Sequence, residues 1–357
     1  MMRLLKMLFV LSVVLFGGYY LLERLELPTE DPIEKISNVV KEKKMQLGSK
    51  EAPEAEENPL EGSLFHWTGL TTDALTSEMG DPSRKDDSPY GYKWWIYTDQ
   101  ISYYVQFAVD EQQEIVGVYA VGEGFDVEPV SMGDSYSRVS EHLSFSEEVD
   151  FQDGLSSYTF HLGPEDLQKR PLAKVSDDLF VQAYFDIFTD QLSSIRVMNG
   201  DMLLSHRPYQ VEYRGSLPEE PDFTDDKWTE IEDGKEQQIF DITNVIRHQH
   251  GRSALEWEES VSQVAYGHSR DMAEQEYFSH TSLNGDGLKE RLGVLDIPYI
   301  TAGENIAAQY PDAPAAMHGW LNSEGHRQAL LNEEYTHLGV GVHRFHYTQN
   351  FIERLAY

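Results

Sequence analysis

An uncharged apolar segment lies near the start of the chain. Residues 7–22 (MLFVLSVVLFGGYYLL) carry no charge, and Arg3 and Lys6 precede them. A positive flank before an apolar run is typical of an export signal, and that flank stays in the cytoplasm. No small-residue cleavage site follows the run. We therefore expect residues 1–26 to be a signal anchor of a single-pass cell-membrane protein whose bulk is extracellular; a cleaved signal peptide is the alternative.

The pattern becomes polar after the anchor. Residues 27–61 are rich in Pro, Glu and Lys, and residues 51–59 (EAPEAEENP) contain too few apolar side chains to pack. This composition predicts a short juxtamembrane helix over residues 33–45, followed by a flexible linker.

Residues 62–218 alternate between a short helical pattern and runs typical of strands. Residues 71–79 predict a helix that ends at Gly80, and aromatic and β-branched residues then mark strands. A similar order recurs later, which predicts a duplicated α+β unit with helices on an antiparallel sheet. The expected strands are 92–97, 101–109 and 115–121 in the first unit and 156–162, 179–188 and 192–198 in the second, where residues 137–143 form the helix.

The first unit contains a dense group of aromatic residues. Alternation of such side chains along strands favours a sheet core with cross-strand pairing. An exposed platform for carbohydrate is the alternative. The group comprises Tyr90, Tyr92, Trp94, Trp95, Tyr97, Tyr103 and Tyr104.

The last part of the chain has a helical period followed by strand patterns. After a linker at residues 219–233, the domain predicted at 234–357 contains helices and then two strands, an α+β order. The expected helices are 236–250, 258–275 and 313–331, and the expected strands are 337–342 and 346–355.

Charge and composition narrow the function. The chain has 62 acidic and 28 basic residues, a net charge of -34, so its field repels phosphate backbones and nucleic-acid binding is not expected. It contains no cysteine, which excludes disulfides, thiolate zinc sites and cysteine nucleophiles. A hydrophobic content of 40% suffices for folded domains.

Seven short motifs in the last domain carry a resemblance to a known family. In this order they resemble a bacterial domain of the CAP superfamily (cysteine-rich secretory protein, antigen 5, pathogenesis-related 1), and residues 62–218 resemble the N-terminal domain that accompanies it in some Firmicute proteins. The motifs are NVIR (244–247), AYGHSRDM (265–272), YFSHT (277–281), GENI (303–306), WLNSEGHR (320–327), LGVGV (338–342) and YTQNF (347–351).

The resemblance implies an α-β-α sandwich with a cleft lined by histidines and acidic residues. Matching the motifs residue by residue places His280, Glu304 and His346 in this cleft. Glu324 is the fourth candidate, although it stands one residue further from Trp320 than in the family, and His326 is the alternative to Glu324.

Two histidines with one or two carboxylates suit Zn²⁺ or another divalent cation. The sequence therefore leaves two functions open. The first is a membrane-anchored module at the cell envelope that binds a peptide, glycan or lipid in the His- and Glu-lined cleft. The second is a metal-dependent hydrolase of extracellular or envelope substrates, with Glu304 or Glu324 as the base. We favour the first because no complete catalytic motif is present.

Overall fold

The structure is a computed structural model that describes residues 60–354. The predicted anchor, and all but the last two residues of the predicted segment at 27–61, lie outside the described residues. Within residues 60–354, no helix is both long enough and apolar enough to cross a membrane.

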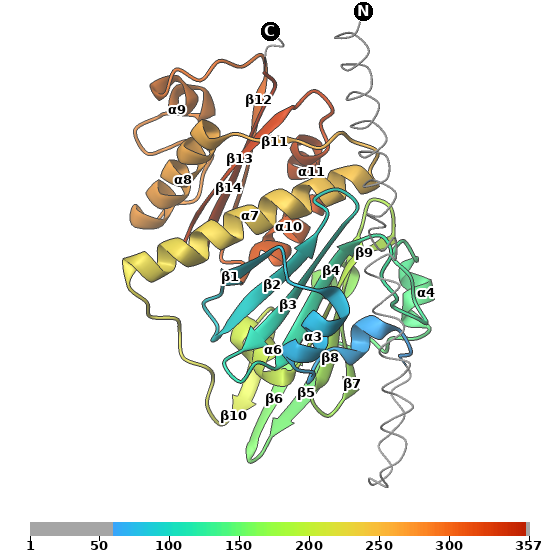
Figure 1. The fold of residues 1–357 in the computed structure, drawn as a ribbon. Helices are drawn as coiled ribbons and strands as arrows, with labels where there is room; N and C mark the ends of the chain where they lie inside the picture. The colour runs from blue at the N-terminus through green and yellow to red at the C-terminus, as the bar shows by residue number, and fades with distance from the viewer. Residues whose placement is uncertain (1–59, 355–357) are drawn as a thin grey trace, which may run out of the picture.

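The first described domain is rich in strands (Figure 1). After a short 3-10 helix at Ser63–His66, its elements are α3 (Thr72–Met79), β1 (Arg84–Asp87), β2 (Tyr92–Thr98), β3 (Tyr103–Asp110), β4 (Ile115–Gly122), α4 (Tyr136–Ser140), β5 (Glu148–Asp153), β6 (Ser156–His161), α5 (Pro164–Lys169), β7 (Leu172–Ser176), β8 (Leu179–Asp186), β9 (Gln191–Met198), α6 (Gly200–His206) and β10 (Gln210–Arg214).

Two meanders join into one sheet in this domain. Its seven strands have the order β1-β2-β3-β4-β9-β8-β7, with β4 and β9 as the antiparallel seam. The two halves follow the repeat expected from the sequence in part. The strand expected at residues 156–162 does not join this sheet, because β6 pairs with β5 and β10 in a separate three-stranded sheet.

The aromatic group belongs to the sheet core. Trp94 is 2% exposed and Tyr104 is fully buried, and Trp94 packs edge-on against Tyr92. Burial of such large rings contributes strongly to stability. Five of the seven side chains are therefore core residues and the other two, Tyr90 and Tyr103, are half-buried, so the group is not an exposed platform for carbohydrate.

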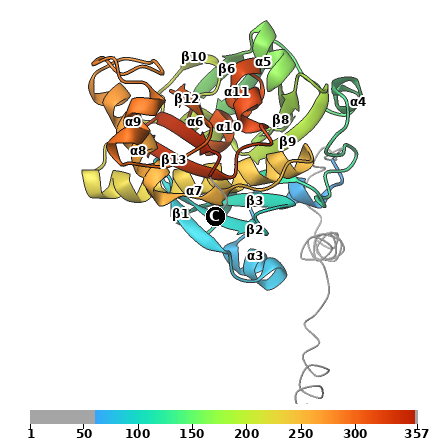
Figure 2. The same ribbon diagram turned by 90° about the horizontal axis from the view of Figure 1, so that it is seen from above.

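The second described domain has three layers. Its elements are α7 (Asp225–Gln249), β11 (Glu256–Trp257), α8 (Glu259–Glu274), α9 (Leu288–Val294), β12 (Ala302–Ala308), α10 (Ala313–Leu321), α11 (Glu324–Leu330), β13 (His337–His343) and β14 (His346–Ile352). The strand order in the sheet is β11-β13-β14-β12, with α8 packed on β13 and β14, and with α7 and α10 also packed against the sheet (Figure 2).

Glycines in the LGVGV stretch let α8 approach the sheet closely. A Cβ atom at Gly341 would lie 1.8 Å from the backbone N of Tyr266, and one at Gly339 would lie 2.2 Å from the backbone N of Ser262. The hydroxyl of Ser262 then donates to the carbonyl of Val340 at 2.6 Å. Any side chain at these two glycines would force α8 away from β13.

Helix α7 connects the two domains. It contacts β13 on one side and β1, β3 and β4 on the other, and it crosses between the two sheets in Figure 1. Thr224 accepts from the N–H of Lys227 and Asp225 and Asp226 follow, which favours a helix start here. The expected linker therefore ends at Thr224, because residues 225–233 are helical. One hydrophobic cluster includes core residues of both domains.

The helix expected at residues 313–331 is broken. Helix α10 ends at Leu321 and α11 begins at Glu324. Between them, Asn322 donates to the carbonyl of Phe185 at 2.9 Å and accepts from the N–H of Ile187 at 2.8 Å. Contacts with the other domain therefore fix the break, which periodicity within this segment could not reveal.

Candidate functional site

Glu304 lies at the centre of a buried polar cluster. It stands on β12 opposite Asn350 of β14, and its side chain is 4% exposed. A carboxylate that is buried in this way needs hydrogen-bond donors on both oxygens, because burying an unpaired charge costs roughly several kcal/mol.

Arg291 of α9 supplies the main counter-charge. Its Nη2 donates to Oε2 of Glu304 at 2.5 Å, and Nη1 donates to the carbonyls of His280 and Asp286, each at 3.1 Å. The surrounding donors and acceptors favour the orientation of the Asn350 amide in which its nitrogen faces Glu304. In this orientation the nitrogen donates to Oε2 of Glu304 at 3.1 Å. Arg291 therefore neutralises Glu304 and fixes the loop that carries His280.

Two histidines face the other oxygen of Glu304. His280 Nδ1 lies 2.9 Å from Oε1, and the His280 side chain is 56% exposed. His268 of α8 lies 4.0 Å from Oε1, and its Nε2 donates to the carbonyl of Ser279 at 3.0 Å. Burial lowers the pKa of His268, although the nearby Glu304 opposes this shift. His268 thus acts as a neutral donor that holds the loop before His280.

His326 approaches from α11. Its ring centroid lies 6.4 Å from that of His280, and its Nδ1 is 2.9 Å from the hydroxyl oxygen of Ser323. The carbonyl of His326 accepts from Asn305 of β12 at 3.1 Å. Burial, and secondarily the charge of His280, lowers the pKa of His326. Of the two residues considered for the fourth position, His326 is the one that lies beside His280.

The other two predicted residues lie apart from this cluster. Glu324 is exposed in the first turn of α11. His346 starts β14 opposite Ala308, whereas Asn350 is opposite Glu304. The two positions are four residues apart, about 13 Å along the strand. The predicted set of His280, Glu304, Glu324 and His346 therefore does not converge.

This arrangement does not fit the metal site implied by the resemblance. Both oxygens of Glu304 already accept protein donors, and Arg291 cancels its charge. Among residues 60–354, no group of three or more His, Cys, Asp or Glu side chains is placed to hold a metal ion.

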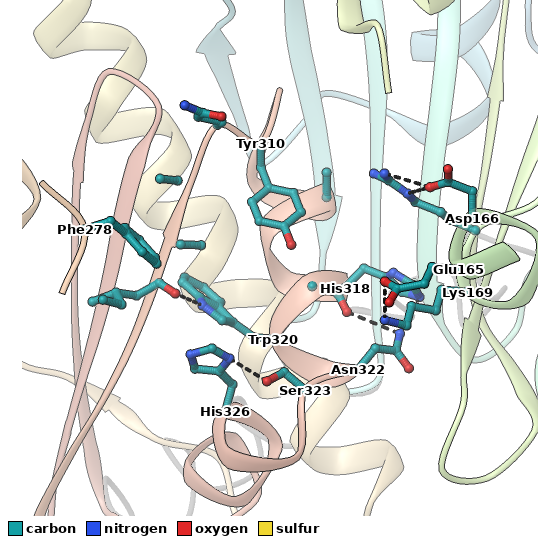
Figure 3. Close-up of a pocket in the computed structure, with 17 residues that line it drawn as sticks. Glu165, Asp166, Lys169, Phe278, Tyr310, His318, Trp320, Asn322, Ser323 and His326 are labelled. Atoms are coloured by element: carbon teal, nitrogen blue, oxygen red, sulfur yellow. Dashed lines mark hydrogen bonds and ion pairs between the residues drawn. The ribbon is translucent and has the colours of Figure 1, made fainter. Parts of the chain in front are cut away.

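A cavity of about 640 Å³ lies beside this cluster, along the outer edge of β12. Residues 306–310 form one wall, and Phe278 and His326 lie at one side (Figure 3). Glu165 and Lys169 of α5, from the first domain, lie at the opposite side. Both domains therefore build this cavity, which has the volume typical of ligand sites.

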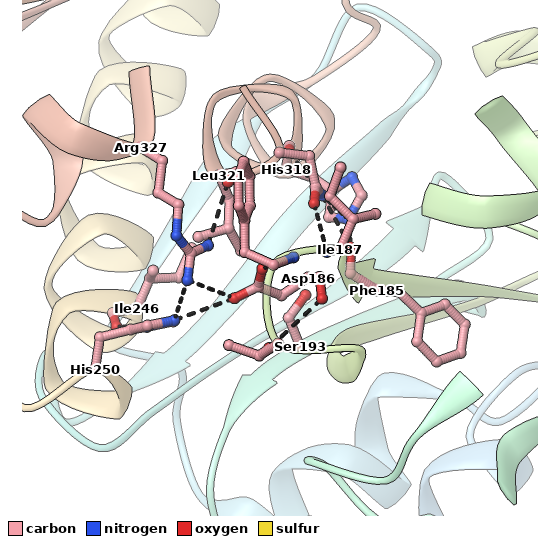
Figure 4. A network of polar contacts seen from close by, with 12 residues as sticks. Phe185, Asp186, Ile187, Ser193, Ile246, His250, His318, Leu321 and Arg327 are labelled. Atoms are coloured by element: carbon pink, nitrogen blue, oxygen red, sulfur yellow. Dashed lines mark hydrogen bonds and ion pairs between the residues drawn. The ribbon is translucent and has the colours of Figure 1, made fainter. Parts of the chain in front are cut away.

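A polar network at the domain interface fixes α11 beside the cavity. Arg327 follows His326 and donates to Asp186 of β8 at 2.8 Å, while His250 lies 3.2 Å from the same carboxylate oxygen (Figure 4). Burial opposes ionisation of Asp186, but these hydrogen bonds prevail and lower its pKa to about 2. The first domain thus positions the helix that carries His326.

A second set of contacts fixes α10. His318 Nε2 lies 3.0 Å from the carbonyl oxygen of Phe185, and burial lowers the pKa of His318 to about 3. At the start of α10, Asp312 accepts from Arg196 of β9 at 2.6 Å, and both side chains are buried. A neutral histidine and a buried ion pair therefore hold the cavity wall.

This architecture, a strand-rich domain joined to a three-layer α/β domain, defines a class of two-domain protein with an interdomain cleft. Residues 69–209 match the family model of the CAP-associated N-terminal domain, and residues 240–352 match that of the cysteine-rich secretory protein family.

Relatives extend this match over most of the chain. The sequence is 44% identical over 291 residues to the "Uncharacterized membrane protein YlbC" of Bacillus subtilis, covering 82% of this chain and 84% of that protein. The chain belongs to the bacterial CAP-domain proteins of the cysteine-rich secretory protein family.

Two solved structures share the fold. An extracellular protein containing an SCP domain from Bacillus anthracis has a TM-score of 0.77 and 42% identity, covering 86% of this chain and 99% of that one. A cysteine-rich secretory protein from Staphylococcus aureus has a TM-score of 0.72 and 28% identity, covering 81% of this chain and 94% of that one.

Sequence reasoning missed Arg291 and the α5 wall of the cavity. Arg291 lies outside the seven motifs, and α5 belongs to the other domain. A signal for Asn350 was present, because this residue lies within the YTQNF motif.

Proposed function

We propose that this protein is an extracellular binding module, anchored in the cell membrane by residues 1–26, that holds a ligand in the cavity between its two domains. The observation that carries the proposal is the contrast between a cavity of about 640 Å³ and the adjoining Glu304, whose oxygens are both engaged by protein donors. The site has room for a ligand, but Glu304 is not free to act as a base.

The similarity to a protein named as a membrane protein and to one described as extracellular supports the location. A metal-dependent hydrolase fits less well. Proton transfer from water to Glu304 would remove the charge that pairs with Arg291 at 2.5 Å and leave the Arg291 guanidinium without its counter-charge. Glu324, the other predicted base, is exposed and does not contact the cluster among the described residues.

The test uses the full-length chain in detergent micelles. Ligand-observed NMR is recorded with three probes: uncharged peptides, an N-acetylglucosamine oligomer and a short-chain phosphatidylglycerol. We expect at least one probe to bind without being cleaved. Phe278→Ala should weaken binding about tenfold, since a partly exposed ring at the cavity would lose its contact with the ligand.

Leu283→Ala provides the matched control. Leu283 is 70% exposed, compared with 55% for Phe278, and it does not line the cavity. We expect it to bind like the wild type. If none of the three probes bound, or if a probe were hydrolysed by the wild type and not by His280→Ala, the proposal would be wrong.

A further inference from the structure

The outer edge of β12 is open at Ala308, beside the cavity. Among residues 60–354, β12 is the last strand of its sheet and pairs only with β14. The N–H of Gln309 donates to Phe345 in the β14 direction at 2.8 Å. Because backbone groups alternate along a strand, the N–H and C=O groups of Ile306 and Ala308 point away from β14. The carbonyl of Ile306 confirms this direction, since it accepts from Trp320 at 2.9 Å.

Ala308 leaves both of its backbone groups available. Within residues 60–354, neither its N–H nor its C=O has a hydrogen-bond partner, and Ala308 lines the cavity. Natural proteins usually cover or disrupt such an edge, since it is a template for another strand. Here a cavity lies along it, which leaves room for an added strand.

The cavity dictates the charge of its occupant. Lys169 pairs with Glu165 at 3.0 Å, and Arg170 pairs with Asp166 at 2.9 Å, so the four charged residues of α5 and its C-terminus cancel in pairs. The opposite side presents Phe278 and the buried Trp320. An uncharged segment therefore fits better than an acidic or basic one.

From these observations we infer that the cavity binds an extended, uncharged peptide segment of a partner protein, which pairs as a short added strand with the free backbone groups of Ala308 on β12. This inference rests on the binding function proposed above and names the ligand class. Main-chain hydrogen bonds to Ala308 supply affinity, as in other strand additions. The peptide contacts α5 as well as β12, so both domains take part in binding.

The test compares two substitutions at one position in the full-length chain. Ala308→Pro removes the outward N–H but no hydrogen bond to β14, and proline is tolerated at such an edge position. Ala308→Ser keeps the N–H. The probe is a pool of uncharged hexapeptides with acetylated and amidated ends. We expect Ala308→Pro to weaken binding at least tenfold, by about 1.4 kcal/mol, with Ala308→Ser close to the wild type.

A second measurement does not depend on any variant. Hydrogen exchange of the wild-type Ala308 amide should slow on addition of the pool, whereas hexapeptides with N-methylated alternate amides should bind weakly. Binding of the saccharide or phospholipid probe alone, or peptide binding unchanged by Ala308→Pro and by N-methylation, would overturn the peptide inference and leave the binding function standing. Absence of binding by all three probe classes would overturn both.

Discussion

The Glu304 cluster and the strand edge at Ala308 both lie on β12, and they differ in whether their polar groups have hydrogen-bond partners among the described residues. Around Glu304, His280, Arg291 and Asn350 fill both carboxylate oxygens. Four residues further along, Ala308 has an N–H and a C=O group that lack a hydrogen-bond partner within the described part of the chain and face a cavity. The family motifs thus converge on a region in which the buried charge of Glu304 is paired, while the cavity proposed to bind a ligand lies beside it. We therefore expect this cluster of titratable residues to hold the fold around the cleft.

The largest loss of stability is expected from a substitution that removes the counter-charge of Glu304. Arg291→Ala leaves the carboxylate of Glu304 buried without its counter-charge, and removing one partner of a buried pair costs about 3–5 kcal/mol. Urea unfolding of the full-length chain measures the loss. The control is Arg138→Ala, which removes an exposed ion pair with Glu141 and should cost less than about 1 kcal/mol. Equal losses in the two variants would show that the Glu304 cluster is not structural.

A smaller, pH-dependent effect is expected at the domain interface. Since hydrogen bonds from His250 and Arg327 lower the pKa of Asp186 to about 2, its carboxylate stabilises the fold fully above about pH 4. That contribution, about 2 kcal/mol, disappears as the pH falls from about 4 towards 2.

Asp186→Asn tests whether the charge of Asp186 stabilises the domain interface. The variant should be less stable than the wild type at pH 6, and the difference should shrink steadily as the solution is acidified. Thermal unfolding across this range gives the measurement. A difference that stays constant with pH would mean that the charge of Asp186 contributes nothing to the interface.

Strands with regular apolar patterns could be predicted from the sequence, and β2, β3 and β4 lie close to the expected ranges. β12 was missed because its sequence, AGENIAA, contains glycine, glutamate and asparagine, which are poor strand formers; pairing with β14 outweighs that preference. The break between α10 and α11 likewise depends on Phe185 and Ile187 of the other domain.

Only those site residues that lie within a sequence motif could be predicted. The motifs identified His280 and Glu304, which the structure brings into contact. His346 also lies in a motif-bearing strand, but strand register places it opposite Ala308 and away from Glu304. Arg291 and α5 reach the site through the packing of distant segments, for which local patterns contain no signal.

The most direct test compares peptide binding by Ala308→Pro with binding by Glu304→Gln in the full-length chain, at a temperature where circular dichroism shows both to be folded. Glutamine keeps the shape of Glu304 and one acceptor for Arg291, so Glu304→Gln should be less stable but should bind the uncharged hexapeptides as the wild type does. Ala308→Pro should be stable and bind at least tenfold more weakly. The opposite result, with binding lost in Glu304→Gln and retained in Ala308→Pro, would contradict this account.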